Sequence, residues 1–184
     1  GQSIWLDYIT RDLVRGGELR RLIEQDGLRG MTSNPTIFQK AIAGGSAYDA
    51  QIEALLGEGR EAGAIFEALA VQDIQEACDL FRPLYDRTNG ADGFVSVEVS
   101  PHLSRDTEGT LVEARRLWRA VDRPNVMIKV PGTEAGIPAV RQLLAEGLNV
   151  NVTLLFARER HEQVMRAYVE ALEQRAAAGQ PIDR

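Results

Sequence analysis

Two kinds of segment alternate along this chain, and their order restricts the fold more than any other feature. Five short runs of apolar and β-branched residues are separated by longer stretches whose apolar residues recur at helical spacing. Strands that alternate with helices in this way lie parallel and are covered by helices, so the sequence predicts an α/β fold. An open doubly wound sheet and a barrel both have this order. The expected strands are residues 3–9, 28–33, 93–100, 126–132 and 148–156.

The helical stretches carry their own start and stop signals. Gly16-Gly17 is expected to break the first helix, and Asn34-Pro35 is a strong start for the second, because Asn caps and Pro fits the first helical position. The stretch 36–85 is longer than one crossover needs, which predicts an extra helical excursion between the second and third strands. Thr133 is expected to cap a later helix, and Tyr168 is expected to point inward from the last one. The expected helical stretches are residues 10–25, 36–85, 104–121, 133–147 and 158–178.

Lys129 interrupts the fourth expected strand, whose other residues are apolar. Lys40 is the only other lysine in the sequence, because 19 of the 21 basic residues are arginine. Arginine neither loses its proton nor forms an imine, whereas a desolvated lysine can do both. The chain therefore keeps a primary amine inside a strand, which indicates a nucleophile. The alternative is a lysine at a strand end that reaches solvent or pairs with a carboxylate.

Polar residues share one face of three consecutive expected strands. Side chains alternate along a strand, so the polar residues lie opposite a face of valine, isoleucine and leucine. In a barrel such polar faces point to the centre, and the carboxyl ends of the strands form the active site. Residues at the ends of the first two strands are expected to join the same ring. The residues expected to converge there are Asp7, Asn34, Glu98, Lys129, Asn151 and Thr153.

Composition excludes several classes of partner and site. A net charge of −6 argues against nucleic acid or an anionic membrane surface as a partner. Cys78 is the single cysteine, and His102 and His161 alone give no zinc-ligand spacing, so we expect no metal. The sequence contains no apolar run of about 18 residues and no signal-peptide core. We therefore expect a cytoplasmic protein that does not span a membrane.

A buried amine beside a carboxylate suits Schiff-base chemistry. Lys129 would attack a ketone, and Glu98 would move protons, directly or through a water. The iminium that forms withdraws electrons, so a neighbouring carbon–carbon bond can break. The alternative is that Glu98 and Lys129 form a structural ion pair. A buried ion pair adds little stability by itself, which favours the catalytic interpretation.

Five motifs, taken together, resemble the transaldolase family. They fall in the family's order at strand ends, and the resemblance covers essentially all 184 residues. The region 48–51 and the long helical excursion resemble the bacterial subgroup that also occurs fused to phosphoglucose isomerase. The motifs are Trp5-Leu6-Asp7, Gly30-Met31-Thr32-Ser33-Asn34-Pro35-Thr36-Ile37-Phe38, Val97-Glu98-Val99, Ile128-Lys129-Val130-Pro131-Gly132-Thr133 and Asn151-Val152-Thr153-Leu154-Leu155-Phe156.

The resemblance implies a TIM (β/α)8 barrel enzyme of the pentose phosphate pathway. Such an enzyme transfers a dihydroxyacetone unit from sedoheptulose 7-phosphate or fructose 6-phosphate to an aldose phosphate. Lys129 is similar to the Schiff-base lysine, so the implied intermediate is covalent and no cofactor is expected. Glu98 resembles the carboxylate that relays protons through a water, and Thr153 the hydroxyl that helps to hold this water. Asp7 resembles the second acid/base group, which acts when the carbon–carbon bond is cleaved.

The resemblance also assigns substrate contacts. Asn34 and Asn151 resemble amides that hold substrate hydroxyls, and Thr32 is expected beside them as a substrate-binding residue. The related fructose-6-phosphate aldolases carry Gln where this chain has Glu98, which favours transaldolase over a simple aldolase. An aldolase and a catalytically inactive α/β fragment remain the alternatives.

One departure from the family is large. A complete barrel has eight strands and typically about 250 residues, whereas five strands are expected here. We therefore expect residues 1–184 to form one barrel domain truncated before its sixth strand. The family's phosphate-binding residues would lie beyond Arg184, in a part that is fused to or associated with this one. Two open strand edges favour aggregation, so the isolated piece is expected to be inactive and poorly soluble. The sequence does not indicate an oligomeric state.

Overall fold

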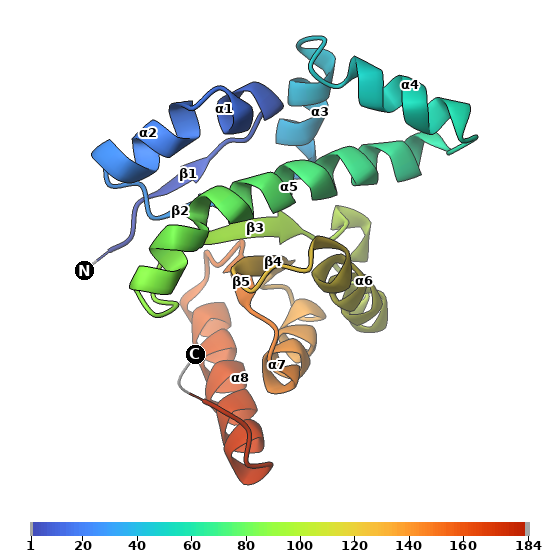
Figure 1. The fold of residues 1–184 in the computed structure, drawn as a ribbon. Helices are drawn as coiled ribbons and strands as arrows, with labels where there is room; N and C mark the ends of the chain where they lie inside the picture. The colour runs from blue at the N-terminus through green and yellow to red at the C-terminus, as the bar shows by residue number, and fades with distance from the viewer. Residues whose placement is uncertain (1, 183–184) are drawn as a thin grey trace. The chain divides into compact units, whose positions relative to one another are not determined.

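The predicted α/β alternation is confirmed. The structure is a computed structural model that describes residues 2–182; Gly1, Asp183 and Arg184, at the ends of the predicted domain, lie outside this part. Five parallel strands form one sheet in the order β1-β2-β3-β4-β5, with helices between them (Figure 1). The strands are β1 (Trp5–Asp7), β2 (Gly30–Thr32), β3 (Phe94–Glu98), β4 (Val126–Pro131) and β5 (Val150–Thr153).

The helices confirm the expected breaks and the excursion between the second and third strands. Gly16 and Gly17 separate the first two helices, and Asn34 caps α3 by accepting a hydrogen bond of 3.0 Å from the Ile37 N–H. The helices are α1 (Arg11–Arg15), α2 (Glu18–Gln25), α3 (Pro35–Ala43), α4 (Asp49–Gly57), α5 (Ala62–Arg87), α6 (Thr107–Val121), α7 (Gly136–Glu146) and α8 (Arg158–Ala177), with a short 3-10 turn at Pro101–Leu103.

The chain divides into two compact units. Unit 1 comprises Gly1–Val95 with Val121–Val126, and unit 2 comprises Ser96–Ala120 with Met127–Arg184. Strands β3 and β4 begin in unit 1 and continue in unit 2. None of the helices within residues 2–182 is long and apolar enough to cross a membrane.

Unit 1 is organised around α5. Helices α1, α2 and α4 pack against it, and Figure 1 shows α4 along its first part. In the parallel β1–β2 pair, Trp5 lies opposite Gly30, and any Cβ at position 30 would meet the Trp5 indole at 2.4 Å. Asn125 is fully buried and donates to the carbonyls of Cys78 and Gly93, so it links the start of β4 to α5. These contacts require a glycine beside Trp5 and hold the start of β4 against α5.

Unit 2 places the end of β4 beside the ends of its neighbouring strands. The Val99 N–H donates to the Lys129 carbonyl, and the β4–β5 register pairs Lys129 with Asn151 and Pro131 with Thr153. The valines of β3 face away from this polar face and are buried, as the alternation predicted. Helices α7 and α8 lie side by side next to β5 (Figure 1).

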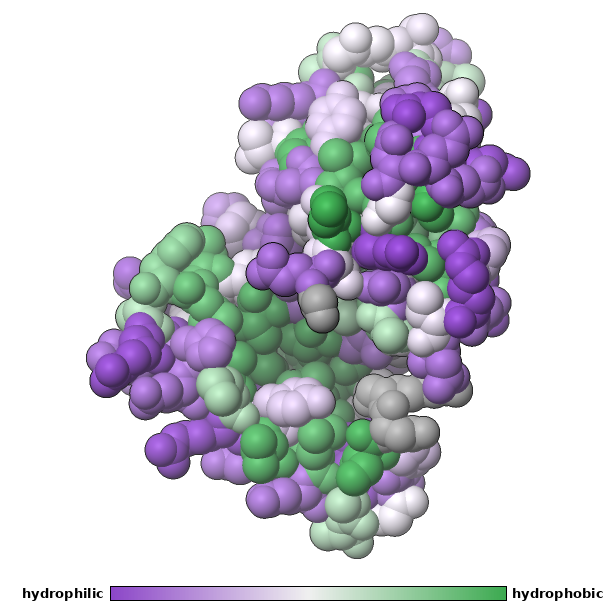
Figure 2. Space-filling view, turned by 90° about the vertical axis from the view of Figure 1, so that its left-hand side faces the viewer, coloured by the Kyte–Doolittle hydropathy of each residue, from purple (hydrophilic) through white to green (hydrophobic). Residues whose placement is uncertain are grey.

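An apolar groove of about 490 Å³ opens on unit 2 between β5, α7 and α8. Figure 2 shows hydrophobic side chains gathered across the lower part of this view, at the height of α7 and α8. The prediction that Tyr168 points inward is wrong, since the side chain is 50% exposed at the groove; the buried residues of α8 are Ala167 and Ala171. The groove is lined by Val140, Leu144, Val150, Val152, Val164, Met165, Tyr168 and Val169.

Candidate active site

Lys129 and Glu98 form the centre of the candidate site in unit 2. The Nζ of Lys129 lies 3.7 Å from Oε2 of Glu98, and their side chains are 12% and 19% exposed. Both are held by strand backbone, since Glu98 ends β3 and Lys129 is in β4. A separation of 3.7 Å is an ion-pair distance, longer than a direct hydrogen bond. A polar contact of this length leaves room for a bridging water.

Asn151 lies beside Lys129 in the sheet, and its side chain is already oriented. Its Nδ2 donates a hydrogen bond of 2.9 Å to Oγ of Ser96, which is fully buried in β3. This bond uses one amide proton and leaves the Asn151 carbonyl as an acceptor. Ser96 was not assigned a role from the sequence. The sequence nevertheless indicates that Ser96 lies near the site, because the alternation of side chains places Ser96 and Glu98 on the same face of one strand.

Thr153 contributes a buried hydroxyl with unused hydrogen-bonding capacity. Its Oγ1 has no hydrogen-bond partner within residues 2–182, and Thr153 lies two residues beyond Asn151 on the same face of β5. A buried polar atom without a partner is rare in a folded protein. Five such side-chain atoms occur in the described part of the chain, and two of them belong to the predicted site residues Thr153 and Thr32. Strand-end hydroxyls are thus left available for a water or a ligand.

The loops that follow β3 and β4 are tied together at the carboxyl ends of these strands. The Thr133 hydroxyl donates to the Ser104 carbonyl at 2.7 Å, and the Thr107 hydroxyl donates to the Ala135 carbonyl at 2.7 Å. Thr133 also accepts a hydrogen bond from the Gly136 N–H. Helix α7 begins at Gly136, three residues after Thr133, and this bond to the first N–H of the helix is the capping contact that the sequence predicts for Thr133.

Leu154, directly after β5, adopts an unusual backbone conformation. Its φ is 60°, in the left-handed region, where the other non-glycine residues described are Asn89 and Asp122. Asn and Asp tolerate this region, whereas leucine is strained there. The turn therefore ends β5 at Thr153 at some energetic expense, next to the candidate site. No sequence pattern predicted this feature.

The other three predicted residues belong to unit 1. Asp7 and Thr32 lie directly opposite each other in the parallel β1–β2 register, at the last position of both strands. Asp7 is exposed, and Thr32 is half-buried with its hydroxyl available. The Oδ1 of Asn34 is used by the helix cap. Its amide nitrogen is therefore the group that can donate to a ligand.

Three basic side chains outside the candidate site lie on the surface. His102, His161 and Lys40 are exposed. Within residues 2–182 there is no group of three or more His, Cys, Asp or Glu side chains placed to hold a metal ion. At the candidate site, the basic and acidic groups that the structure brings together are Lys129 and Glu98.

Comparison with known proteins identifies the family to which this chain belongs. Residues 4–178 match the model of the Transaldolase/Fructose-6-phosphate aldolase family. The chain is 52% identical to "Transaldolase 2" of Nostoc punctiforme over all 184 residues, which make up 48% of that protein. It is 50% identical to "Transaldolase" of Trichodesmium erythraeum (100% of this chain, 48% of the relative) and of Parafrankia sp. (99% and 49%). The chain thus spans about half the length of the curated relatives it matches.

Proposed function

Because the chain belongs to the Transaldolase/Fructose-6-phosphate aldolase family, we propose that it carries the Schiff-base machinery of a transaldolase. The reaction transfers a dihydroxyacetone unit from a ketose phosphate, sedoheptulose 7-phosphate or fructose 6-phosphate, to an aldose phosphate. The observation that carries the proposal is the partly buried Lys129 amine 3.7 Å from Glu98, with Asn151 paired to Lys129 in the neighbouring strand. The relatives at about 50% identity are named transaldolases.

The first half of the proposed reaction uses unit 2. The Lys129 amine attacks the C2 carbonyl of the ketose, and loss of water from the carbinolamine gives an iminium. Glu98 takes and returns the protons of these steps through a water, which suits the 3.7 Å gap. The Thr153 hydroxyl, which has no hydrogen-bond partner within residues 2–182, is available to bind this water. The lysine itself supplies the electron sink, so we propose that no further cofactor is used.

The second half cleaves and remakes a carbon–carbon bond. Asp7 removes the proton of the C4 hydroxyl, the C3–C4 bond breaks, and its electron pair moves into the iminium to give an enamine while the aldehyde product leaves. The enamine then attacks the acceptor aldehyde, and hydrolysis frees Lys129. Asn34 and Asn151 are proposed to hold substrate hydroxyls, with Thr32 beside them. In this scheme Asn34 donates through its amide nitrogen, and Asn151 accepts through its carbonyl.

Borohydride trapping tests the central claim on the complete gene product. Fructose 6-phosphate plus borohydride should give a covalent adduct that peptide mass spectrometry assigns to Lys129. Lys129→Met should abolish the adduct, and Lys40→Met, at the only other lysine, should leave it unchanged. Transfer onto erythrose 4-phosphate identifies a transaldolase. An adduct on Lys40, or no adduct at all, would overturn the assignment.

The same experiment separates the alternatives. A fructose-6-phosphate aldolase would form the adduct but release free dihydroxyacetone without an acceptor. The presence of Glu98, where the aldolases resembled carry Gln, favours the transferase. An inactive α/β protein would give neither adduct nor product.

The extent of the active protein is also a proposal. We propose that the five β/α units of residues 1–184 belong to an eight-stranded barrel, and that sugar phosphates, rather than nucleic acid or membranes, are its partners. The open apolar groove beside β5 supports the proposal of a larger barrel, because an apolar surface of this kind is usually covered in a stable protein. The purified 184-residue chain is accordingly expected to be inactive; sustained turnover by it would contradict this. The proposed location is the cytoplasm.

A further inference from the structure

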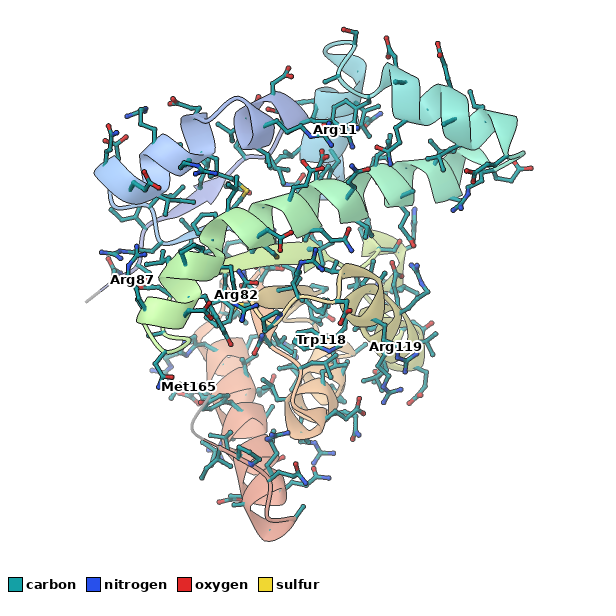
Figure 3. The ribbon with its side chains drawn as sticks, in the orientation of Figure 1. Arg11, Arg82, Arg87, Trp118, Arg119 and Met165 are labelled. Atoms are coloured by element: carbon teal, nitrogen blue, oxygen red, sulfur yellow. The ribbon has the colours of Figure 1, made fainter. Side chains whose placement is uncertain are left out.

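A buried polar cluster lies in unit 1, outside the residues discussed so far. It consists of Arg11, Tyr48 and Asp73, which are 3%, 2% and 0% exposed. Arg11 Nε donates to Asp73 Oδ1 at 2.8 Å, and the Tyr48 hydroxyl donates to Asp73 Oδ2 at 2.7 Å. The Arg11 guanidinium carbon also lies 4.3 Å from the centre of the Tyr48 ring. Arg11, labelled in Figure 3, thus connects α1 to α5 and to the start of α4.

The cluster holds the backbone as well as side chains. The Arg11 N–H donates to the Tyr48 hydroxyl at 3.0 Å, which satisfies one of the N–H groups that a helix start leaves unpaired. Arg11 is the first residue of α1, and only residues 8–10 separate it from Asp7 at the end of β1. Within this loop Ile9 is fully buried and Thr10 caps the helix through the Leu13 N–H. The short loop after Asp7 is therefore fixed at both ends.

Holding α1 against α5 does not by itself require this cluster. One turn further along α1, Arg15 makes two hydrogen bonds of 2.7 and 2.5 Å to Glu76 on α5. A buried ion pair is also weak evidence for stability, because removing two charges from water offsets their attraction. The buried cluster differs from the Arg15–Glu76 pair because it also binds the backbone, through the hydrogen bond from the Arg11 N–H to the Tyr48 hydroxyl. This bond holds the chain at the end of the short loop that follows Asp7.

From this geometry we infer that Arg11, Tyr48 and Asp73 are positioning residues for Asp7. The inference depends on the proposed function, in which Asp7 removes the C4 hydroxyl proton. A carboxylate on an exposed strand end samples many positions unless the chain around it is fixed, and proton transfer needs hydrogen-bond geometry. The cluster acts through the backbone of the three-residue loop, so it contributes to bond cleavage and leaves Schiff-base formation on Lys129 unaffected.

Tyr48→Phe in the complete gene product is the direct test. It removes only the hydroxyl and keeps the ring that packs with Leu55, Ile65 and Leu69. The borohydride adduct on Lys129 should form at the wild-type rate. Release of glyceraldehyde 3-phosphate from fructose 6-phosphate in a single turnover should slow on the order of 10-fold, as expected when a catalytic group is displaced by a fraction of an ångström. Glu76→Gln, which weakens the neighbouring link between α1 and α5, is the matched control and should leave cleavage unchanged.

A double-mutant cycle separates positioning from general weakening of the fold. In an Asp7→Asn background, Tyr48→Phe should have no further effect on cleavage, because the group through which it acts is gone. Asp73→Asn is the second variant and should give the same pattern. An equal slowing in both backgrounds, or unchanged cleavage in Tyr48→Phe and Asp73→Asn, would overturn the inference. Absence of any adduct in the wild type would instead overturn the proposed function.

Discussion

The amide of Asn151 is held by Ser96 through a hydrogen bond of 2.9 Å, and Ser96 is fully buried. Ser96→Ala should let this amide rotate without touching Lys129 or Glu98. We expect KM for the ketose phosphate to rise about 2- to 10-fold, which corresponds to a hydrogen bond of about 0.5–1.5 kcal/mol, with a smaller change in kcat. Steady-state kinetics of the complete gene product measure this, with the exposed Ser46→Ala as the control. An unchanged KM would show that the orientation of Asn151 does not affect binding.

Glu98→Gln should separate the proton relay from the attachment of substrate. The amide keeps the shape of the side chain but cannot take up a proton, so kcat should fall on the order of 100-fold or more, the usual range for a lost general acid/base. Borohydride trapping after long incubation should still reach the wild-type level, because Lys129 remains. Quench-flow experiments measure how fast the Lys129 adduct forms in the variant and in the wild type. Unaltered kcat would mean that Glu98 is only the ion-pair partner of Lys129.

Gly136 should resist substitution by alanine although it begins a helix. An added Cβ would lie 2.0 Å from the carbonyl oxygen of Pro131, a backbone atom that cannot move aside freely. We expect Gly136→Ala to lower the free energy of unfolding by about 1–3 kcal/mol, as overpacking does. Gly63, near the start of α5, has open space around its Cβ direction, so Gly63→Ala should raise stability by about 0.4–1 kcal/mol. Urea denaturation of both variants measures the two changes in unfolding free energy, which should have opposite signs. Equal changes would contradict the close approach of position 136 to the Pro131 carbonyl.

The Arg115–Glu146 pair should stabilise unit 2 only above acidic pH. Hydrogen bonds of 2.9 and 2.6 Å from Arg115 are the main cause that lowers the pKa of the Glu146 carboxyl below its ordinary value of 4.5, against a smaller opposing effect of burial. A carboxyl with a lowered native pKa contributes stability above its unfolded pKa and loses it as the pH falls through the native one. Since the pair is partly exposed, solvent screens it and its contribution is small.

Comparing wild type with Glu146→Gln by urea unfolding at several pH values tests this contribution. The difference in unfolding free energy should be constant above about pH 4.5, the ordinary pKa of the group, and should disappear at lower pH. The exposed Glu159→Gln on α8 serves as the control and should show no such difference. A difference that grows on acidification would reverse the sign and contradict the assigned cause.

Local chemistry made much of this fold predictable. The Asn34 cap, the Gly16-Gly17 break and the alternation around Lys129 all depend on neighbours in sequence, and all three are confirmed. The site in unit 2 followed from the same alternation, because parallel strands in register bring equivalent positions side by side.

The features that were missed depend on contacts between distant segments. Arg11 and Asp73 are 62 residues apart, and no local pattern indicates that they pair. The bond from the Thr133 hydroxyl to the Ser104 carbonyl joins residues 29 apart, and no local pattern predicts it. Tyr168 follows the helical period of an inward residue, yet the buried face of α8 is formed by Ala167 and Ala171.

The contrast between Lys40 on the surface and Lys129 inside the sheet gives this protein a built-in spectroscopic reference. Only these two side chains carry ε-amines, so reductive methylation with isotope-labelled formaldehyde would yield two lysine methyl signals in an NMR spectrum. The Lys40 signal would report solvent, and the Lys129 signal, from a side chain 12% exposed beside a carboxylate, would report the site. Comparison of the two signals would then follow the surroundings of the Lys129 side chain, with no substitution in the chain.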